Sequence, residues 1–327
     1  MDCLSAATMP WLAPAIERIR TAAARGRMPH SLLILGSAGL GAPQLAAWTA
    51  GFAVCEAPLE RRPCGACAAC RLLQSDTHPD LHVVRIEEDA KQIKVEQVRE
   101  LIEALAQKSY RGGYKVGLIE GAEALNANGA NAFLKTLEEP GADTLLIMTA
   151  ARSHRLPATI ASRCLRLAIP VPEPAVARDW LAAGSAGERG LDTALALAAG
   201  APLLAQSLAR EGLESLEKDM RESLRQLAAG SVDLTLLAEQ WVRTDLPLRL
   251  RWLENWVTGR IFAGLDAGVS SQTAEPVRLP AALLKPKIRA MYALLDALAE
   301  FRRLAQTGMN QQLALEALLL RGRSIFS

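Results

Sequence analysis

Four of the six cysteines in this chain lie close together, between positions 55 and 70. They are Cys55, Cys64, Cys67 and Cys70, in the pattern C-x8-C-x2-C-x2-C, with Gly65 and small alanines that permit tight turns. Four thiolates satisfy tetrahedral zinc and leave no open position, so this spacing predicts a structural zinc site. An iron–sulfur cluster is the alternative, because C-x2-C-x2-C also occurs in ferredoxins, although the usual Cys-Pro continuation is absent.

The remaining thiols and two nearby imidazoles are assigned no part in this site. Cys3 and Cys164 are expected to be unrelated to the cluster. His78 and His82 are interpreted as surface or strand-end residues, because four thiolates already close a zinc shell.

A glycine-rich turn, Gly36-Ser37-Ala38-Gly39-Leu40-Gly41, follows an apolar run and precedes a helical pattern. Such a turn can place backbone N–H groups and a helix N-terminus around phosphates. A working phosphate loop continues with lysine and then serine or threonine, which contact the phosphates and magnesium. Ala42 and Pro43 hold those positions here, and neither supplies that chemistry. The alternative interpretation of these glycines is an ordinary tight turn.

A second segment has the form of a strand that carries nucleotide-handling acids. The run from Lys115 leads through mostly apolar residues to Glu120. In the usual pair of acids the second one polarises the attacking water, but Gly121 stands at that place. Glu120 is either a remnant of a magnesium site or an exposed acid at a strand end. The two defects together predict that the chain does not hydrolyse nucleotide.

The elements that would position these residues alternate between strand and helix. A parallel α/β sheet is the fold class that such alternation predicts. The expected strands are Ser31–Leu35, Leu81–Ile86, Lys115–Ile119, Thr144–Thr149 and Leu165–Ile169, and the expected helices are Trp11–Arg25, Ile93–Gln107, Asn126–Glu138 and Pro157–Arg163.

A proline-rich segment, Pro170–Pro174, marks a domain boundary, because proline removes backbone donors and restricts its neighbours. From Ala175 onward only helical periodicity occurs, interrupted at Gly184–Gly190, Gly200–Pro202 and Asp266–Pro280. We therefore expect a nucleotide-fold domain over 1–170 with the zinc module at 55–70. A small helical lid domain over 171–206 and an all-helical domain over 207–327 are expected to follow.

The composition is that of an ordinary globular protein of 327 residues, with 50% hydrophobic and 22% charged residues. No apolar stretch reaches the roughly 18 residues that a membrane span needs, and the first residues do not resemble a secretion signal. We therefore expect a cytoplasmic protein with no membrane partner. A net charge of +2 is far below that of a dedicated nucleic-acid-binding protein.

The segment Asn131–Pro140, which reads NAFLKTLEEP, resembles the corresponding helix of the clamp-loader subunits of bacterial DNA polymerase III, an AAA+-type family. Ser162-Arg163-Cys164 matches a Ser-Arg-Cys motif of the same family. Together with the degenerate loops and the cysteine module, the similarity is closer to the delta' branch than to the ATP-hydrolysing gamma/tau branch. It is specific from about Pro29 to Ile169 and only general beyond.

This resemblance implies a subunit that stands beside gamma/tau-type ATPases and the delta subunit and helps to load the sliding clamp onto primed DNA. It implies that Arg163 acts in trans, as a finger that stabilises charge on the γ-phosphate bound by a neighbouring subunit. An isolated arginine at a helix end would instead interact with terminal carbonyls. Active relatives carry a lid arginine where this chain has Leu203, which adds to the expected inertness. No functional ATP site is expected, and zinc is the only expected cofactor.

Several surfaces are open to more than one interpretation. Basic residues near two loops either contact DNA or a neighbouring subunit, or are simply solvated; they are Lys108, Arg111, Lys115, Arg152 and Arg155. Trp241, Trp252 and Trp256 suit either a helical core or the collar that the C-terminal domains of the family assemble. The competing functions are a weak ATPase and a zinc-dependent DNA-binding module.

Overall fold

The computed structural model describes residues 1–87, 90, 92–151, 156–184, 190–210, 212–266, 286–305 and 309–326. Two compact units divide the chain. The first unit comprises Met1–Leu191 and Gly200–Ser207, and the second comprises Asp192–Ala199 and Leu208–Ser327. The expected domain boundaries near 170 and 206 stay predictions, because the lid region 171–206 contributes residues to both units.

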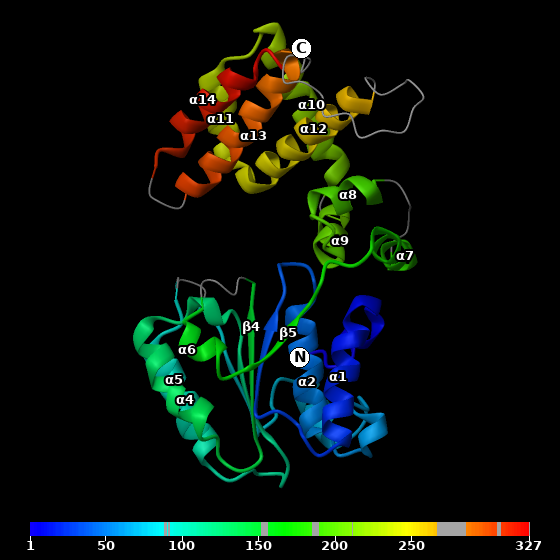
Figure 1. Cartoon of the computed structure of the whole chain (residues 1–327), viewed down its shortest axis with the longest axis vertical. Coiled ribbons are helices and arrows are strands. Elements are labelled where there is room, and N and C mark those ends of the chain that lie inside the picture. Colours follow the sequence, from blue (N-terminus) through cyan, green and yellow to red (C-terminus); the bar gives the residue numbers. More distant parts are fainter. Residues whose placement is uncertain are drawn as a thin grey trace, which may run out of the picture. The chain divides into compact units, whose positions relative to one another are not determined.

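A five-stranded sheet organises the first unit, and every pairing between its strands is parallel. The predicted parallel α/β fold is therefore confirmed, and each predicted strand corresponds to one observed strand. The strand order is β2-β3-β4-β1-β5, with β1 at Ser31–Leu35, β2 at Leu81–Val84, β3 at Lys115–Ile119, β4 at Thr144–Ala150 and β5 at Leu165–Ala168 (Figure 1).

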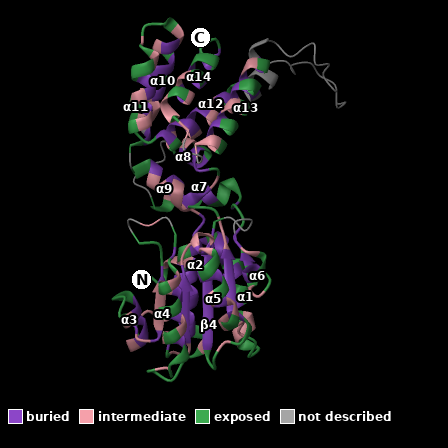
Figure 2. Ribbon diagram, turned by 90° about the vertical axis from the view of Figure 1, so that its left-hand side faces the viewer, coloured by how far each residue is buried: buried purple, intermediate pink, exposed green. Residues whose placement is uncertain are grey.

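The central strands are buried along their whole length, as a parallel sheet covered on both faces requires. Every residue of β3 and β4 is buried, and Leu32, Leu33 and Ile34 of β1 are fully inaccessible. This continuous burial is visible in β4 in Figure 2. The edge strand β5 differs, because Leu165 is 44% exposed.

Two layers of helices cover the sheet (Figure 1). One face packs on α4, α5 and α6 through a core that includes Leu101, Phe133 and Ile160. The other face is covered by α2, with α1 beside it. The bounds are α1 Ala13–Ala24, α2 Ala42–Val54, α3 Ala68–Gln74, α4 Val95–Ala106, α5 Ala127–Glu138 and α6 Ala158–Ala161, with short 3-10 helices at Ser5–Thr8, Pro10–Leu12, Leu59–Arg61 and Ala122–Ala124.

From residue 174 onward the described residues form helices and their connections, as the periodicity predicts. They are α7 Pro174–Gly184, α8 Leu191–Leu197, α9 Pro202–Arg210, α10 Leu213–Ala229, α11 Leu234–Arg243, α12 Leu246–Asp266, α13 Pro286–Leu304 and α14 Gln311–Gly322. Of the predicted interruptions, most of 184–190 and nearly all of 266–280 lie outside the described residues. No helix in the described part of the chain combines the length and apolar character needed to cross a bilayer.

The second unit packs α11, α12, α13 and α14 around an apolar centre. Trp241 is fully buried there, and Trp252 is 3% exposed. Trp256 is less buried, and its ring lies 6.4 Å from that of Trp252 and 5.9 Å from that of Phe326. Two of the three tryptophans therefore belong to the core of this unit.

Candidate functional site

The glycine-rich turn lies where the sequence predicts, between the end of β1 and the start of α2. Gly39 and Gly41 have φ values of +84° and +92°, in the left-handed region that glycine adopts without strain. Ala42 and Pro43 open α2, and proline is tolerated in the first turn of a helix because its missing N–H has no partner there. The strand–turn–helix arrangement that a phosphate loop uses is thus present, whereas its lysine and hydroxyl are absent.

The start of α9 packs directly onto this loop. The backbone N–H of Leu203 donates a hydrogen bond to the carbonyl of Gly39 at 3.1 Å. A Cβ placed on Gly39 would lie 2.5 Å from Cβ and 2.7 Å from the backbone nitrogen of Leu204. The loop therefore has no room for even a methyl group at Gly39, because the start of α9 occupies that side of it.

Apolar side chains close the neighbouring part of the loop. A Cβ on Gly41 would lie 3.2 Å from Leu12 and 3.3 Å from the sulfur of Met9. The indole N–H of Trp11 donates to the carbonyl of Leu40 at 2.8 Å. The segment before α1 thus fixes the loop from a second side, a contact that nothing in the loop's own sequence indicates.

Glu120 follows β3, as predicted, and is half-buried. Its carboxylate lies 3.8 Å from Nε of Arg85. Gly121 has a φ of +72°, and its N–H donates to the Thr149 hydroxyl at 3.0 Å. An acid at position 121 would be strained in this conformation, so the glycine has a backbone reason. Thr149, at the end of β4, is a polar residue of this site that the sequence reasoning did not single out.

Arg163 lies between α6 and β5, and its guanidinium is partly exposed. Its Nε donates to Glu138 Oε1 at 2.7 Å, a second guanidinium nitrogen contacts the same oxygen, and Nη1 donates to the Thr159 carbonyl at 2.8 Å. The Ser31 hydroxyl at the start of β1 donates to the Arg163 carbonyl at 2.9 Å. The backbone of Arg163 is therefore fixed to the central sheet while its charge lies at the surface. Glu138 belongs to the segment that resembles the family, but its pairing could not be inferred from the sequence.

The four clustered cysteines converge on one point, with all sulfur atoms within 4.8 Å of one another. The sulfurs of Cys55 and Cys67 are 3.8 Å apart, and those of Cys64 and Cys70 are 4.0 Å apart. Tetrahedral zinc with sulfur ligands at about 2.3 Å needs sulfur separations of about 3.8 Å, so the cluster could hold a zinc ion.

Backbone N–H groups point at these sulfurs. The N–H groups of Cys64, Cys67 and Cys70 lie within hydrogen-bond reach of the sulfurs of Cys55, Cys64 and Cys67, at 3.3–3.4 Å. Donation from the backbone of Ala66 and Cys67 lowers the pKa of the Cys64 thiol to about 6. This donation favours the thiolate of Cys64, the form that binds a metal, whereas burial raises the pKa of the Cys55 and Cys70 thiols.

Cys3 is not among the four clustered cysteines, but it lies beside them. It is fully buried, and its thiol lies near those of Cys55 and Cys70. A Cβ on Gly51 of α2 would lie 2.6 Å from the Cys3 Cβ. The N-terminal segment packs between α2 and the cysteine module. The sequence pattern did not indicate this contact, because Cys3 lies about fifty residues before the module. Cys164 lies elsewhere, with its sulfur 3.1 Å from the Ile160 carbonyl.

Comparison with known proteins places this arrangement in a family. A family model described as "DNA polymerase III, delta subunit" matches residues 11–173. DNA polymerase III subunit delta' of Pseudomonas aeruginosa is 36% identical over 307 residues, which cover 92% of this chain and 94% of that protein. The delta' subunit of Escherichia coli is 33% identical over 321 residues, covering 95% and 94%.

This chain belongs to the DNA polymerase III delta' family. The Escherichia coli tau subunit is 36% identical over only 155 residues, which cover 46% of this chain and 24% of tau. The similarity to delta' proteins thus extends through the helical C-terminal part, whereas the similarity to tau covers less than half of the chain.

The imidazoles of this delta' family member are less exposed than the sequence suggested. His78 is buried rather than on the surface, and His82 is half-buried in β2. Burial lowers the pKa of both imidazoles. Neither belongs to the group of metal-ligating side chains found among the described residues.

A buried carboxylate next to His78 also escaped the sequence reasoning. Asp80 is 2% exposed and accepts from the Ser109 hydroxyl at 3.1 Å and from the N–H groups of Tyr110 and Arg111 at 2.7 and 3.0 Å. It therefore orders the loop that carries two of the predicted basic residues.

The basic residues singled out in the sequence lie in different surroundings. Lys115 is buried, and its ammonium donates to the carbonyls of Leu105 and Gln107 at 2.6 and 2.8 Å at the C-terminal end of α4. Arg111 is paired with Glu56. Lys108 is exposed, and Arg152 and Arg155 lie outside the described residues. Lys115 is therefore a helix-capping residue and not a surface contact.

The packing of α9 against the glycine-rich loop can be tested by comparing alanine substitutions at two glycines, Gly39 and Gly112, which both have a positive φ. In Gly39→Ala the new methyl group would collide with Leu204, whereas Gly112 has a φ of +73° and nothing within 4 Å of an added Cβ. Both variants bear the cost of a left-handed alanine, on the order of 1 kcal/mol. Only Gly39→Ala should expose the Leu203 amide to hydrogen exchange. Equal protection of that amide in both variants would contradict the packing.

Proposed function

We propose that this chain is the delta' subunit of a DNA polymerase III clamp loader, which works with gamma/tau-type ATPase subunits and a delta subunit to load the sliding clamp onto primed DNA. Family membership over almost the whole chain supports this assignment. Clamp loading of this kind takes place in the cytoplasm. The expected division into a nucleotide-fold domain, a lid and a helical collar domain belongs to the same proposal.

The chain itself is proposed to be catalytically inert. Three features support this proposal: α9 fills the space beside Gly39, Ala42 and Pro43 replace the phosphate-binding lysine and hydroxyl, and Gly121 replaces the water-polarising acid. Leu203, where active relatives carry an arginine, contributes its backbone to closing the loop. The fold serves as a platform, and hydrolysis belongs to the neighbouring subunits.

The observation that carries the proposal is the position of Arg163. Its guanidinium is partly exposed while its backbone is tied to β1. In the assembled complex Arg163 reaches the ATP site of a neighbouring subunit and stabilises the charge that develops on the γ-phosphate. Glu138 pairs with the guanidinium before that contact forms, so a phosphate must displace this carboxylate.

The cysteine module is proposed to hold one structural zinc ion, with Cys55, Cys64, Cys67 and Cys70 as its ligands. The sulfur separations and the N–H···S contacts fit a closed four-thiolate shell. When bound, zinc supplies a crosslink between the end of α2 and the start of α3. Cys3 packs beside this shell without being needed to complete it.

Metal analysis tests the zinc proposal. Purified protein should contain about one zinc per chain, and a mercurial reagent should release it. Cys70→Ser should lose the metal and lower the melting temperature, because the remaining ligands leave the shell open. Cys164→Ser is the matched control, since this half-buried thiol lies outside the cluster. Full zinc retention in Cys70→Ser, or iron in place of zinc, would refute the assignment.

Substitution of the finger tests the functional proposal. In a complex reconstituted with ATPase subunits, clamp and primed DNA, Arg163→Ala should lower turnover at the facing ATP site by about a thousandfold. Total hydrolysis should fall by that site's share, and clamp loading should fail. Arg99→Ala removes an exposed arginine of α4 and serves as the control. Unchanged hydrolysis and loading in Arg163→Ala would defeat the assignment.

A further inference from the structure

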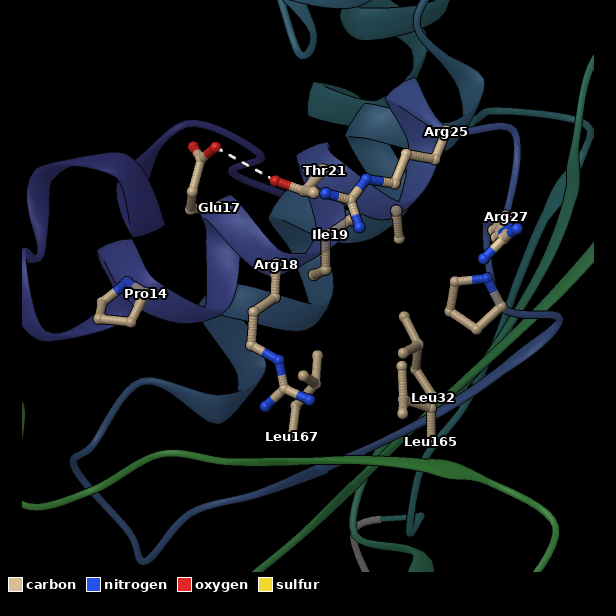
Figure 3. Close-up of a pocket in the computed structure, with 12 residues that line it drawn as sticks. Pro14, Glu17, Arg18, Ile19, Thr21, Arg25, Arg27, Leu32, Leu165 and Leu167 are labelled. Carbon is tan, nitrogen blue, oxygen red and sulfur yellow. Dashed lines mark hydrogen bonds between the residues drawn. The ribbon is translucent and has the colours of Figure 1, made fainter.

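A groove of about 500 Å³ lies between α1 and the β5 edge of the sheet. Its inner side is apolar: Leu165 of β5 is exposed there, over the buried side chains of Ile19, Leu32 and Leu167. Figure 3 shows these side chains between the helix and the two strands. Neither the phosphate loop nor Arg163 belongs to the lining, so the groove is separate from the site described above.

The rim of the groove is cationic. Arg18 projects from α1, Arg25 is the residue that ends the helix, and Arg27 follows it (Figure 3). All three are exposed, and none of them forms an ion pair with a carboxylate in the described part of the chain. Glu17 is the one acidic lining residue, and it accepts a hydrogen bond from Thr21 at 3.3 Å. The groove therefore combines an apolar interior with an excess of positive charge.

The strand that borders the groove has a free edge. Among the described strands, β5 pairs with β1 alone. The carbonyl of Leu35 accepts from Ile169 at 2.7 Å, and the parallel register places Leu35 opposite Ala168. In a parallel ladder the N–H and carbonyl groups of every second residue point to the same neighbouring strand. The backbone groups of Leu167, like those of Ile169, therefore point to β1, and those of Arg166 and Ala168 point outward. Arg166 and Ala168 are both exposed.

We propose that this groove binds an extended acidic segment of a partner protein, which adds to β5 as a sixth strand. Alternate side chains of an added strand point to one face of the sheet. Apolar side chains on that face would enter the groove beside Leu165, and carboxylates would meet the arginines on the rim. The outward backbone groups of Arg166 and Ala168 supply hydrogen bonds that do not depend on sequence, as in other cases of strand addition.

The chemistry of the lining favours such a segment over nucleic acid. Binding of single strands relies on aromatic rings that stack on bases, and the groove has none. An apolar interior is also unsuited to phosphates, which are strongly hydrated. The arginines act chiefly in selecting an acidic partner, because exposed ion pairs contribute little to affinity.

Fluorescence anisotropy with the full chain tests the proposal. The probe is a fluorescein-labelled ten-residue peptide, Val-Thr-Glu-Thr-Val-Thr-Glu-Thr-Val-Thr, in which valine and glutamate share one face of the added strand, and we expect saturable binding. Arg18→Glu combined with Arg25→Glu should weaken it about tenfold by charge reversal. Ala168→Pro should weaken it similarly, because proline removes one outward N–H donor. Arg99→Glu, on α4, is the matched charge control and should bind like the unaltered chain.

Three results would overturn the proposal. The first is the absence of saturable binding by the unaltered chain at millimolar peptide. The second is equal binding by the unaltered chain and by the double arginine variant, which keeps the test valid if Ala168→Pro fails to fold. The third is displacement of the probe by a short oligothymidylate that binds more tightly, which would assign the groove to nucleic acid.

Discussion

The contact between Gly39 and the start of α9 is the constraint on which the other features depend. Because residue 39 is a glycine, the loop and the backbone of Leu204 approach so closely that no side chain would fit between them. The Leu203 N–H adds a hydrogen bond to the Gly39 carbonyl. In an active nucleotide fold the backbone N–H groups of such a loop receive a phosphate. Here the start of α9 packs against the loop at Gly39, and the lysine and hydroxyl that would contact phosphate and magnesium are absent.

The central strand β1 connects this closed loop to the residue that carries the proposed function. Its C-terminal end leads into the glycine-rich turn, and Ser31 at its other end bonds the Arg163 carbonyl. A strand that is buried on both faces allows little movement of either end. The arginine is thus presented from a rigid support, and Glu138 orders its side chain. Rigid support of a charged group is what stabilisation of a transition state in a neighbouring subunit requires.

Much of this could be predicted from the sequence, because short-range patterns determine it. The apolar runs predicted all five strands to within two residues at each end, and the cysteine spacing predicted which sulfurs converge. Contacts between distant segments could not be predicted. The burial of Lys115 depends on carbonyls at the end of α4, and the position of Cys3 depends on how the N-terminal segment crosses α2. The role of Leu203 in closing the loop also required the fold, although its departure from the active pattern was visible.

The most direct test of an inert platform is calorimetric titration of the pure chain with MgATP. Filling of the loop by α9 predicts no saturable heat of binding at nucleotide concentrations up to the millimolar range. It also predicts no change in hydrogen exchange at the Leu203 amide when nucleotide is added. Saturable binding accompanied by exposure of that amide would mean that α9 moves aside for phosphate, and the account of a permanently closed loop would be wrong.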